Sequence, residues 1–326
     1  MASNVQTKTL VTTDGRKYTY DTVPAQDNKP TVLLIHGYPV TRHDWKYQIE
    51  DLSAAGYGVI APDCLGYGDS DKPLEVEAYK LKGISNHIAE ILDKEGLNKV
   101  IGVGHDWGAG VLSRVAVWHP DRLEKIVFMS VGYNQPGNFL DVDAINANSL
   151  KATGKMPFGY WYFFNSPDAP SLAASHIESF FSLVFPTDNL KWIDNIGALG
   201  SARAWLNNNT TTPLPSYMTE EDRTAWIEAF SQPNATTGSM NYYKALLRGV
   251  NDEDEAILTD ENRTLRVPVL TIGGAQDLIT RPEHQRMTTE SFSAAGYTDK
   301  ILDAGHWMIY EDREGVKNAL LEFIKE

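Results

Sequence analysis

Short apolar runs alternate with longer amphipathic segments along most of the chain. From residue 31 onward the apolar runs cover residues 31–35, 58–61, 100–103, 125–131, 267–272 and 300–302. Segments with helical periodicity lie around 45–54, 77–95, 107–118, 282–294 and 313–324. Strands that are apolar on both faces and alternate with helices are typical of a parallel sheet covered by helices. The pattern therefore predicts an α/β fold with a mostly parallel central sheet.

Two regions depart from this alternation. Residues 9–20 form two β-rich runs around the turn pair Asp14-Gly15, which predicts an antiparallel hairpin at the sheet edge. Residues 134–250 contain no comparable strand run, and clusters of Pro, Asn and Thr separate their helical stretches. We therefore expect an inserted helical cap, or lid, at 134–250, and a core formed by residues 1–133 and 251–326.

The expected cap begins and ends with contrasting segments. Residues 158–164, FGYWYFF, are too rich in aromatic side chains for a solvated surface, so we expect them to roof a pocket. The acidic run at 251–255 follows the cap, and such runs are usually solvated. We expect that run to be an exposed connection without a chemical role.

Composition and charge narrow the class of function. With 42% hydrophobic and 22% charged residues, the chain has the composition of an ordinary globular protein. Its formal net charge of −14 repels phosphate backbones and anionic membrane surfaces, so nucleic acid is not an expected partner. No stretch approaches the roughly 20 apolar residues of a membrane span, and the first residues do not resemble a signal peptide. Together with a single cysteine, Cys64, this predicts a cytoplasmic protein. The sequence does not decide between a monomer and a homodimer.

The segment 100–110, VIGVGHDWGAG, has the pattern of a nucleophile elbow: a strand, a tight turn framed by glycines, and a helix. Small residues two positions before and after the centre, here Gly104 and Gly108, allow the strained turn to present Asp106 as the nucleophile. Asp106 could instead be a helix N-cap. A dinucleotide-binding loop fits less well, because the glycine spacing is G-x-G-x-x-x-G and the turn follows the third strand. An aspartate is ionised near neutrality and needs no base for its own attack.

An acid and a histidine follow later strands in the order that accompanies such an elbow. Asp277 comes after the run that ends at residue 272, and His306 comes after the last run. His306 would deprotonate the water that hydrolyses an ester on Asp106, while Asp277 would fix the tautomer of His306 and stabilise its imidazolium. We expect the backbone N–H groups of Tyr38 and Trp107 to form the oxyanion hole.

The remaining histidines outside these motifs show no metal-ligand spacing. They are His43, His87, His119, His176 and His284. We expect them to be surface or packing residues, and we expect no metal ion or organic cofactor.

Four motifs together resemble those of the epoxide hydrolase family: HGYP at 36–39, GYGDS at 66–70, GHDWG at 104–108 and GHW at 305–307. The resemblance covers most of the chain and implies the α/β-hydrolase fold. It also implies two cap tyrosines that hold the epoxide oxygen, here Tyr160 and Tyr243, with Tyr162 and Tyr242 close enough in sequence to replace them. One departure is Leu65, where the family often has an arginine.

The resulting hypothesis is an epoxide hydrolase. Asp106 would open an apolar epoxide, aryl or long-chain, and water would then release a vicinal diol. Phe158, Trp107 and Trp307 are expected to bind the substrate. Detoxification and turnover of a lipid epoxide are both compatible with this activity.

Two other functions are compatible with the same residues. A haloalkane dehalogenase would use the same triad, and such enzymes share the tryptophan after the nucleophile. They usually carry asparagine where Tyr38 stands and do not need the tyrosine pair. A non-catalytic small-molecule receptor could reuse the fold, although the complete set of Asp106, Asp277 and His306 argues against it.

Overall fold

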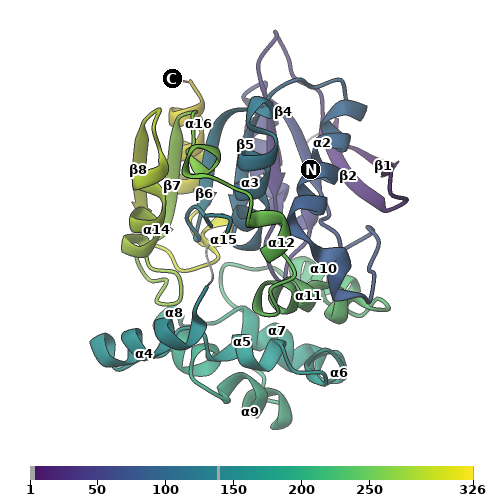
Figure 1. The fold of residues 1–326 in the computed structure, drawn as a ribbon. Helices are drawn as coiled ribbons and strands as arrows, with labels where there is room; N and C mark the ends of the chain where they lie inside the picture. The colour runs from purple at the N-terminus through teal and green to yellow at the C-terminus, as the bar shows by residue number, and fades with distance from the viewer. Residues whose placement is uncertain (1–3, 138–139, 326) are drawn as a thin grey trace.

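The centre of the molecule is a twisted, mostly parallel sheet (Figure 1). In the computed structural model, which describes residues 4–137 and 140–325, its eight strands follow the order β1-β2-β4-β3-β5-β6-β7-β8. β1 and β2 form an antiparallel hairpin, β2 is antiparallel to β4, and all other neighbours are parallel. The strands are β1 (Gln6–Val11), β2 (Lys17–Val23), β3 (Thr31–Ile35), β4 (Gly58–Pro62), β5 (Val100–His105), β6 (Leu123–Met129), β7 (Val269–Gly274) and β8 (Tyr297–Leu302). The predicted sheet and its N-terminal hairpin are confirmed.

Burial along the strands follows their position in the sheet. Every residue of β3, β4, β5 and β7 is buried, as expected for strands covered on both faces. β8 is an edge strand, begins before the predicted 300–302, and has no fully buried residue. The expectation that this last run is covered on both faces is therefore wrong: as the last strand of the described sheet, β8 is packed less fully than the central strands.

Helices flank the sheet; α1 packs against α16, and α2 packs against α3. The core helices are α1 (Lys46–Ala54), α2 (Leu81–Lys94), α3 (Trp107–Trp118), α14 (Pro282–Thr289), α15 (Met308–Glu311) and α16 (Arg313–Lys325). The helix predicted at 77–95 is broken at Lys80, whose ψ of 119° separates a 3₁₀ turn, Val76–Tyr79, from α2. Within the described ranges, no helix is both long enough and apolar enough to span a bilayer.

A helical segment separates β6 from β7, and most of it gathers at one end of the sheet (Figure 1). Its helices are α4 (Val142–Thr153), α5 (Gly159–Phe164), α6 (Ala169–Ser175), α7 (Ile177–Val184), α8 (Asn189–Trp192), a π-helical turn (Ile193–Gly197), α9 (Ser201–Asn207), α10 (Glu220–Phe230), α11 (Ala235–Leu247), α12 (Asp252–Glu255) and α13 (Asp260–Arg263). The aromatic run 158–164 forms α5, which contacts α9 and α11. This insertion places aromatic side chains above the carboxyl ends of the strands.

The acidic run 251–255 is not the solvated connection that its composition predicts. Asn251 and Glu255 are only 4% exposed. The Glu255 carboxylate accepts hydrogen bonds at 2.8 and 3.1 Å from the guanidinium of Arg114, a residue of α3 that is 1% exposed. The Asn251 side chain accepts a hydrogen bond from the backbone N–H of Leu81, the first residue of α2. The expectation is wrong for the two ends of the run, because one face of the short helix α12 packs onto the core, whereas Asp252 and Glu253 are exposed as predicted.

Candidate active site

Asp106 occupies a strained turn between β5 and α3. Its φ of 53° and ψ of −121° lie in a region that residues other than glycine rarely adopt. A Cβ on Gly104 would lie 2.5 Å from the carbonyl oxygen of Gly108, and a Cβ on Gly108 would lie 2.0 Å from that of Ile35. The glycine frame is therefore a steric requirement. The Asp106 side chain makes no capping hydrogen bond to α3, so the N-cap alternative is wrong.

The two carboxylate oxygens of Asp106 have different neighbours. Oδ1 accepts a hydrogen bond of 2.8 Å from the backbone N–H of Tyr38. Oδ2 lies 3.6 Å from Nε2 of His306. Gly37 permits the approach of the two loops, since a Cβ there would lie 2.5 Å from Cβ of Asp106. The Tyr38 amide thus lies where an oxyanion-hole donor is expected, while the contribution of the Trp107 amide stays a prediction.

Asp277 lies behind His306 and is fully enclosed by donors. Its Oδ2 accepts hydrogen bonds from Nδ1 of His306 at 2.8 Å and from the Thr280 hydroxyl at 2.6 Å. Its Oδ1 accepts the backbone N–H groups of Ile279 and Thr280, each at 2.9 Å. Burial alone would raise the pKa of Asp277, but His306 and these hydrogen bonds lower it. Asp277 is therefore a fixed negative charge that orients the imidazole.

His306 is buried between the two carboxylates. Burial opposes its charged form, but Asp277 and Asp106 outweigh that effect and raise the pKa of His306 to about 10. With both carboxylates ionised, His306 is therefore an imidazolium at neutral pH. Removing the charge of either carboxylate would lower this pKa.

Further residues hold the loop that carries His306. The carbonyl oxygen of His306 accepts hydrogen bonds from Nε2 of His105 and from the Ser130 hydroxyl, both at 2.9 Å. Glu311 accepts the backbone N–H of Gly305 at 2.6 Å and that of Trp307 at 3.1 Å. Sequence reasoning missed these supports. His105 belongs to a recognised motif, but no sequence signal indicates its contact with His306, 201 residues away. Glu311 lies only six residues after Gly305, yet no sequence signal indicates that contact either.

The two predicted tyrosines lie edge to face and line the same cavities as Asp106. Tyr160 comes from α5 and Tyr243 from α11, and their ring centroids are 5.9 Å apart. Burial raises the pKa of both hydroxyls, and the charge of Asp106 raises each of them further, so both stay protonated.

The alternative tyrosines bind elsewhere. The Tyr162 hydroxyl is hydrogen-bonded to Asp143, and 38% of Tyr162 is exposed. The Tyr242 hydroxyl donates to the carbonyl oxygen of Leu65 at 2.9 Å. Neither Tyr162 nor Tyr242 has its hydroxyl free to face Asp106.

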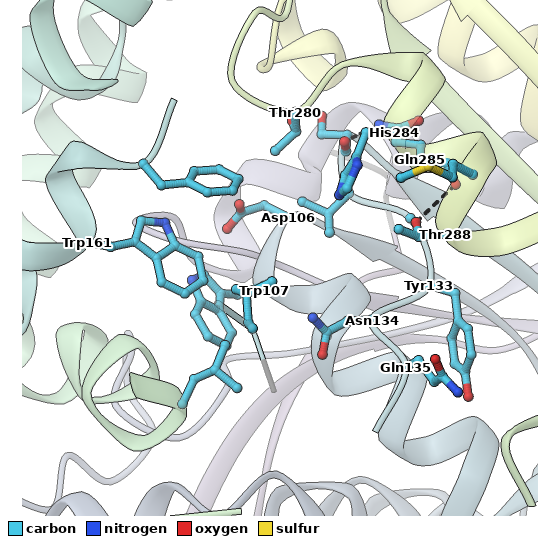
Figure 2. A pocket seen from close by; sticks show the side chains of 18 of the residues that line it. Asp106, Trp107, Tyr133, Asn134, Gln135, Trp161, Thr280, His284, Gln285 and Thr288 are labelled. Atoms are coloured by element: carbon cyan, nitrogen blue, oxygen red, sulfur yellow. Dashed lines mark hydrogen bonds between the residues drawn. The ribbon is translucent and has the colours of Figure 1, made fainter. Parts of the chain in front are cut away.

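Two cavities of unequal size meet at Asp106. The larger has a volume of about 340 Å³ and the smaller about 20 Å³. Asp106, Tyr160 and Tyr243 line both cavities. Figure 2 shows the Asp106 carboxylate directed into the larger cavity, with Trp107 and Trp161 on one wall. A reacting group between the carboxylate and the tyrosines would lie where the cavities join.

The predicted substrate-binding residues divide between the two cavities. Phe158 and Trp107 line the larger cavity, whereas Trp307 lines the smaller one. The indole N–H of Trp307 donates a hydrogen bond of 2.9 Å to the carbonyl oxygen of Val184. His284, expected to be a surface or packing residue, lines the larger cavity (Figure 2). Over the described residues, no cluster of three or more His, Cys, Asp or Glu has the arrangement of a metal site.

Comparison with known proteins agrees with this geometry. A family model described as the alpha/beta hydrolase fold matches residues 30–313. Epoxide hydrolase 3 from Siraitia grosvenorii is 31% identical over 250 residues, covering 76% of this chain and 75% of the relative. The chain belongs to the epoxide hydrolases of the α/β-hydrolase superfamily.

Other relatives extend the likeness over nearly the whole chain. Epoxide hydrolase A from Mycobacterium tuberculosis is 28% identical, with 98% of this chain and 97% of that protein covered. The crystal structure of epoxide hydrolase A from Mycobacterium thermoresistibile superimposes with a TM-score of 0.80 at 26% identity, covering 99% and 98% of the two chains. The chain spans about half the length of the rat bifunctional epoxide hydrolase 2, which it matches at 26% identity over 91% of its own length. These similarities confirm the predicted α/β-hydrolase fold.

Proposed function

We propose that this chain hydrolyses an apolar epoxide to a vicinal diol through a covalent ester on Asp106. One observation carries the proposal: a carboxylate on a nucleophile elbow lies across a cavity from two buried, protonated tyrosines. An epoxide needs a nucleophile at carbon and a proton donor at oxygen, on opposite sides of the bond that breaks.

In the first step, Oδ2 of Asp106 attacks a ring carbon, because Oδ1 is held by the Tyr38 N–H. A carbon–oxygen bond forms as the ring carbon–oxygen bond breaks. Tyr160 and Tyr243 bind the ring oxygen and supply the proton that makes it a hydroxyl. Such acid assistance is typically worth about 10² to 10⁴ in rate.

The second step uses the change in charge that the first produces. The ester at Asp106 carries no negative charge, so one of the causes of the raised pKa of His306 is lost. The imidazolium releases its proton to restore the tyrosine hydroxyl, and neutral His306 becomes the base. His306 then takes a proton from water as the water oxygen attacks the ester carbon. The Tyr38 N–H stabilises the resulting oxyanion. Its collapse breaks the ester bond to the diol oxygen, the acid proton left on Asp106 passes to that oxygen, and the diol leaves with the Asp106 carboxylate and the imidazolium restored.

The larger cavity supports an apolar substrate. Its walls include Trp107, Phe158 and Trp161, together with amide and hydroxyl side chains such as Asn134 and Thr288. A cavity of about 150 Å³ can hold a benzene ring, so 340 Å³ accommodates an aryl group or a branched chain. Of the described residues that line this cavity, none is a lysine or arginine that could pair with a carboxylated tail.

Three finer proposals accompany the activity. Residues 134–250 serve as the cap that holds both tyrosines over the core. The single, buried Cys64 and the net charge of −14 support a cytoplasmic location. The width of the larger cavity supports detoxification of aryl epoxides or turnover of a lipid epoxide.

The test is a paired assay on the purified chain. Diol formation from styrene oxide and halide release from a chloroalkane are measured for the wild type and for Asp106→Asn, which abolishes the nucleophile. We expect diol formation that disappears in the variant, and single-turnover incorporation of labelled water oxygen into the Asp106 carboxylate. Halide release without diol formation would identify a dehalogenase. Binding of the epoxide with no product from either substrate would identify a receptor.

A further inference from the structure

The two cavities give an epoxide an asymmetric site. Asp106 and the tyrosine pair line both, so an epoxide ring held between them lies at the junction. The three-membered ring has two carbons, and their substituents extend away from each other. When one substituent enters the larger cavity, a substituent on the other carbon has only the smaller cavity to enter.

The smaller cavity has room for about one water molecule. Its volume is about 20 Å³, and a site of roughly 10 to 15 Å³ is needed to hold a water. His306 lines it, as does Tyr38, whose buried hydroxyl has no hydrogen-bond partner among the described residues. A water needs two or more polar partners, and these two side chains and the Asp106 carboxylate supply them. The smaller cavity, called the chamber below, can hold the water that His306 activates, but it cannot also hold a carbon chain.

Tight packing keeps this chamber small. Val184, Trp192 and Ile196 of the inserted segment form part of its wall and are 1%, 7% and 4% exposed. The Trp192 indole N–H is bonded to the carbonyl oxygen of Leu183 at 2.8 Å, and its ring centroid lies 5.3 Å from that of His306. Enlarging the chamber would require several packed side chains to move together, and close-packed interiors resist such movement.

We propose that the chain selects epoxides with bulk on only one ring carbon, and that Ile196 is a specificity-determining residue that excludes a second substituent. The proposal rests on the epoxide hydrolase function proposed above. A chain on the second carbon would collide with the wall around Ile196 and displace the water that completes the reaction. Terminal epoxides with one aryl or branched substituent satisfy both limits.

The experiment compares two substrates with four forms of the protein. Styrene oxide carries one substituent, and trans-2-phenyl-3-propyloxirane adds a propyl group on the second carbon. For the wild type, kcat/KM for styrene oxide is expected to exceed that for the propyl substrate by about 100-fold, since one misfitting methylene can cost about 10- to 200-fold. In Ile196→Ala this ratio is expected to fall by about tenfold or more.

Ile193→Ala is the matched control, because Ile193 lies in the same π-helical turn, is 2% exposed, and lines neither cavity. It should leave the substrate ratio at the wild-type value. Val184→Ala provides a second lining variant and should also lower the ratio if Ile196→Ala does not fold.

Three results would overturn the proposal while leaving the hydrolase function intact. They are equal wild-type kcat/KM for both substrates, an unchanged ratio in both folded lining variants, and a ratio that falls equally in Ile193→Ala. Absence of diol from both substrates would instead contradict the proposed function itself.

Discussion

Nε2 of His306 lies 3.6 Å from Oδ2 of Asp106. This separation makes the protonation of the base depend on the charge of the nucleophile, because the Asp106 carboxylate is one of the groups that raise the pKa of His306. The free site therefore contains an ion pair. In the proposed mechanism, esterification of Asp106 converts this pair into a neutral ester beside a basic imidazole, so His306 would become an active base only when an ester is present to hydrolyse.

Replacing the base should trap the ester. In His306→Gln the attack by Asp106 remains possible, but deprotonation of water is lost, so steady-state turnover should fall by about 10² to 10⁴. Intact-protein mass spectrometry after addition of styrene oxide should show one substrate mass added per chain. His176→Gln, a half-exposed position outside both cavities, should turn over like the wild type and carry no adduct. A His306→Gln protein that is inactive and unmodified would contradict the two-step mechanism.

The same histidine predicts how stability changes with pH. The pKa of His306 is raised from about 6.5 in an unfolded chain to about 10 in the folded protein, mainly by Asp277 and Asp106 acting against burial. The stabilisation from its charge is therefore fully present below about pH 6.5 and is lost as pH rises toward 10. Urea unfolding of the wild type should show stability falling between pH 6.5 and 10. In His306→Gln this part of the fall should be absent, and equal slopes in the two proteins would contradict the assignment.

Two pairs of tyrosines provide matched tests of the proton donors. Tyr160→Phe and Tyr243→Phe should each lower kcat for styrene oxide by about 10-fold or more, and the double variant should approach the full 10² to 10⁴ expected of acid assistance. Tyr162→Phe removes a hydroxyl that is bonded to Asp143 and should leave kcat near the wild-type value.

Tyr242→Phe separates stability from catalysis. It leaves the buried carbonyl of Leu65 without its donor, so the free energy of unfolding should fall by about 1–3 kcal/mol. Its kcat should change less than that of Tyr243→Phe. A larger loss of kcat in Tyr242→Phe than in Tyr243→Phe would reverse the assignment of the α11 tyrosine.

The buried ion pair between Arg114 of α3 and Glu255 of α12 should contribute strongly to the stability of the fold. Glu255→Gln leaves the guanidinium of Arg114 buried without a counter-charge, which typically costs about 3–5 kcal/mol. Glu253→Gln on the same short helix is the control, because Glu253 forms only an exposed pair with Lys80 at 3.8 Å, worth about 0 to 1 kcal/mol. Urea denaturation of both variants measures the difference. Equal free energies of unfolding in the two variants would show that burial of Arg114 does not require the charge of Glu255.

Much of the site could be predicted because its residues belong to local patterns. Asp106 is presented by a turn whose shape depends on Gly104 and Gly108, only two residues away on each side. Asp277 and His306 follow strand ends, and the carboxyl ends of parallel strands meet at one edge of the sheet. Periodicity likewise indicated the sheet and most core helices, although it missed the break at Lys80 and the exposure of β8.

The sequence by itself determined the fold class and predicted the nucleophile and the order of the triad, because each depends on the types and spacing of neighbouring residues. Only the tertiary structure separated Tyr243 from Tyr242, since adjacent residues on α11 point to different sides of the helix. It also decided that Glu255 is buried and that one cavity is far smaller than the other. Those properties depend on packing between segments more than a hundred residues apart in the chain, such as Arg114 with Glu255. A local sequence pattern does not indicate which distant segments pack together.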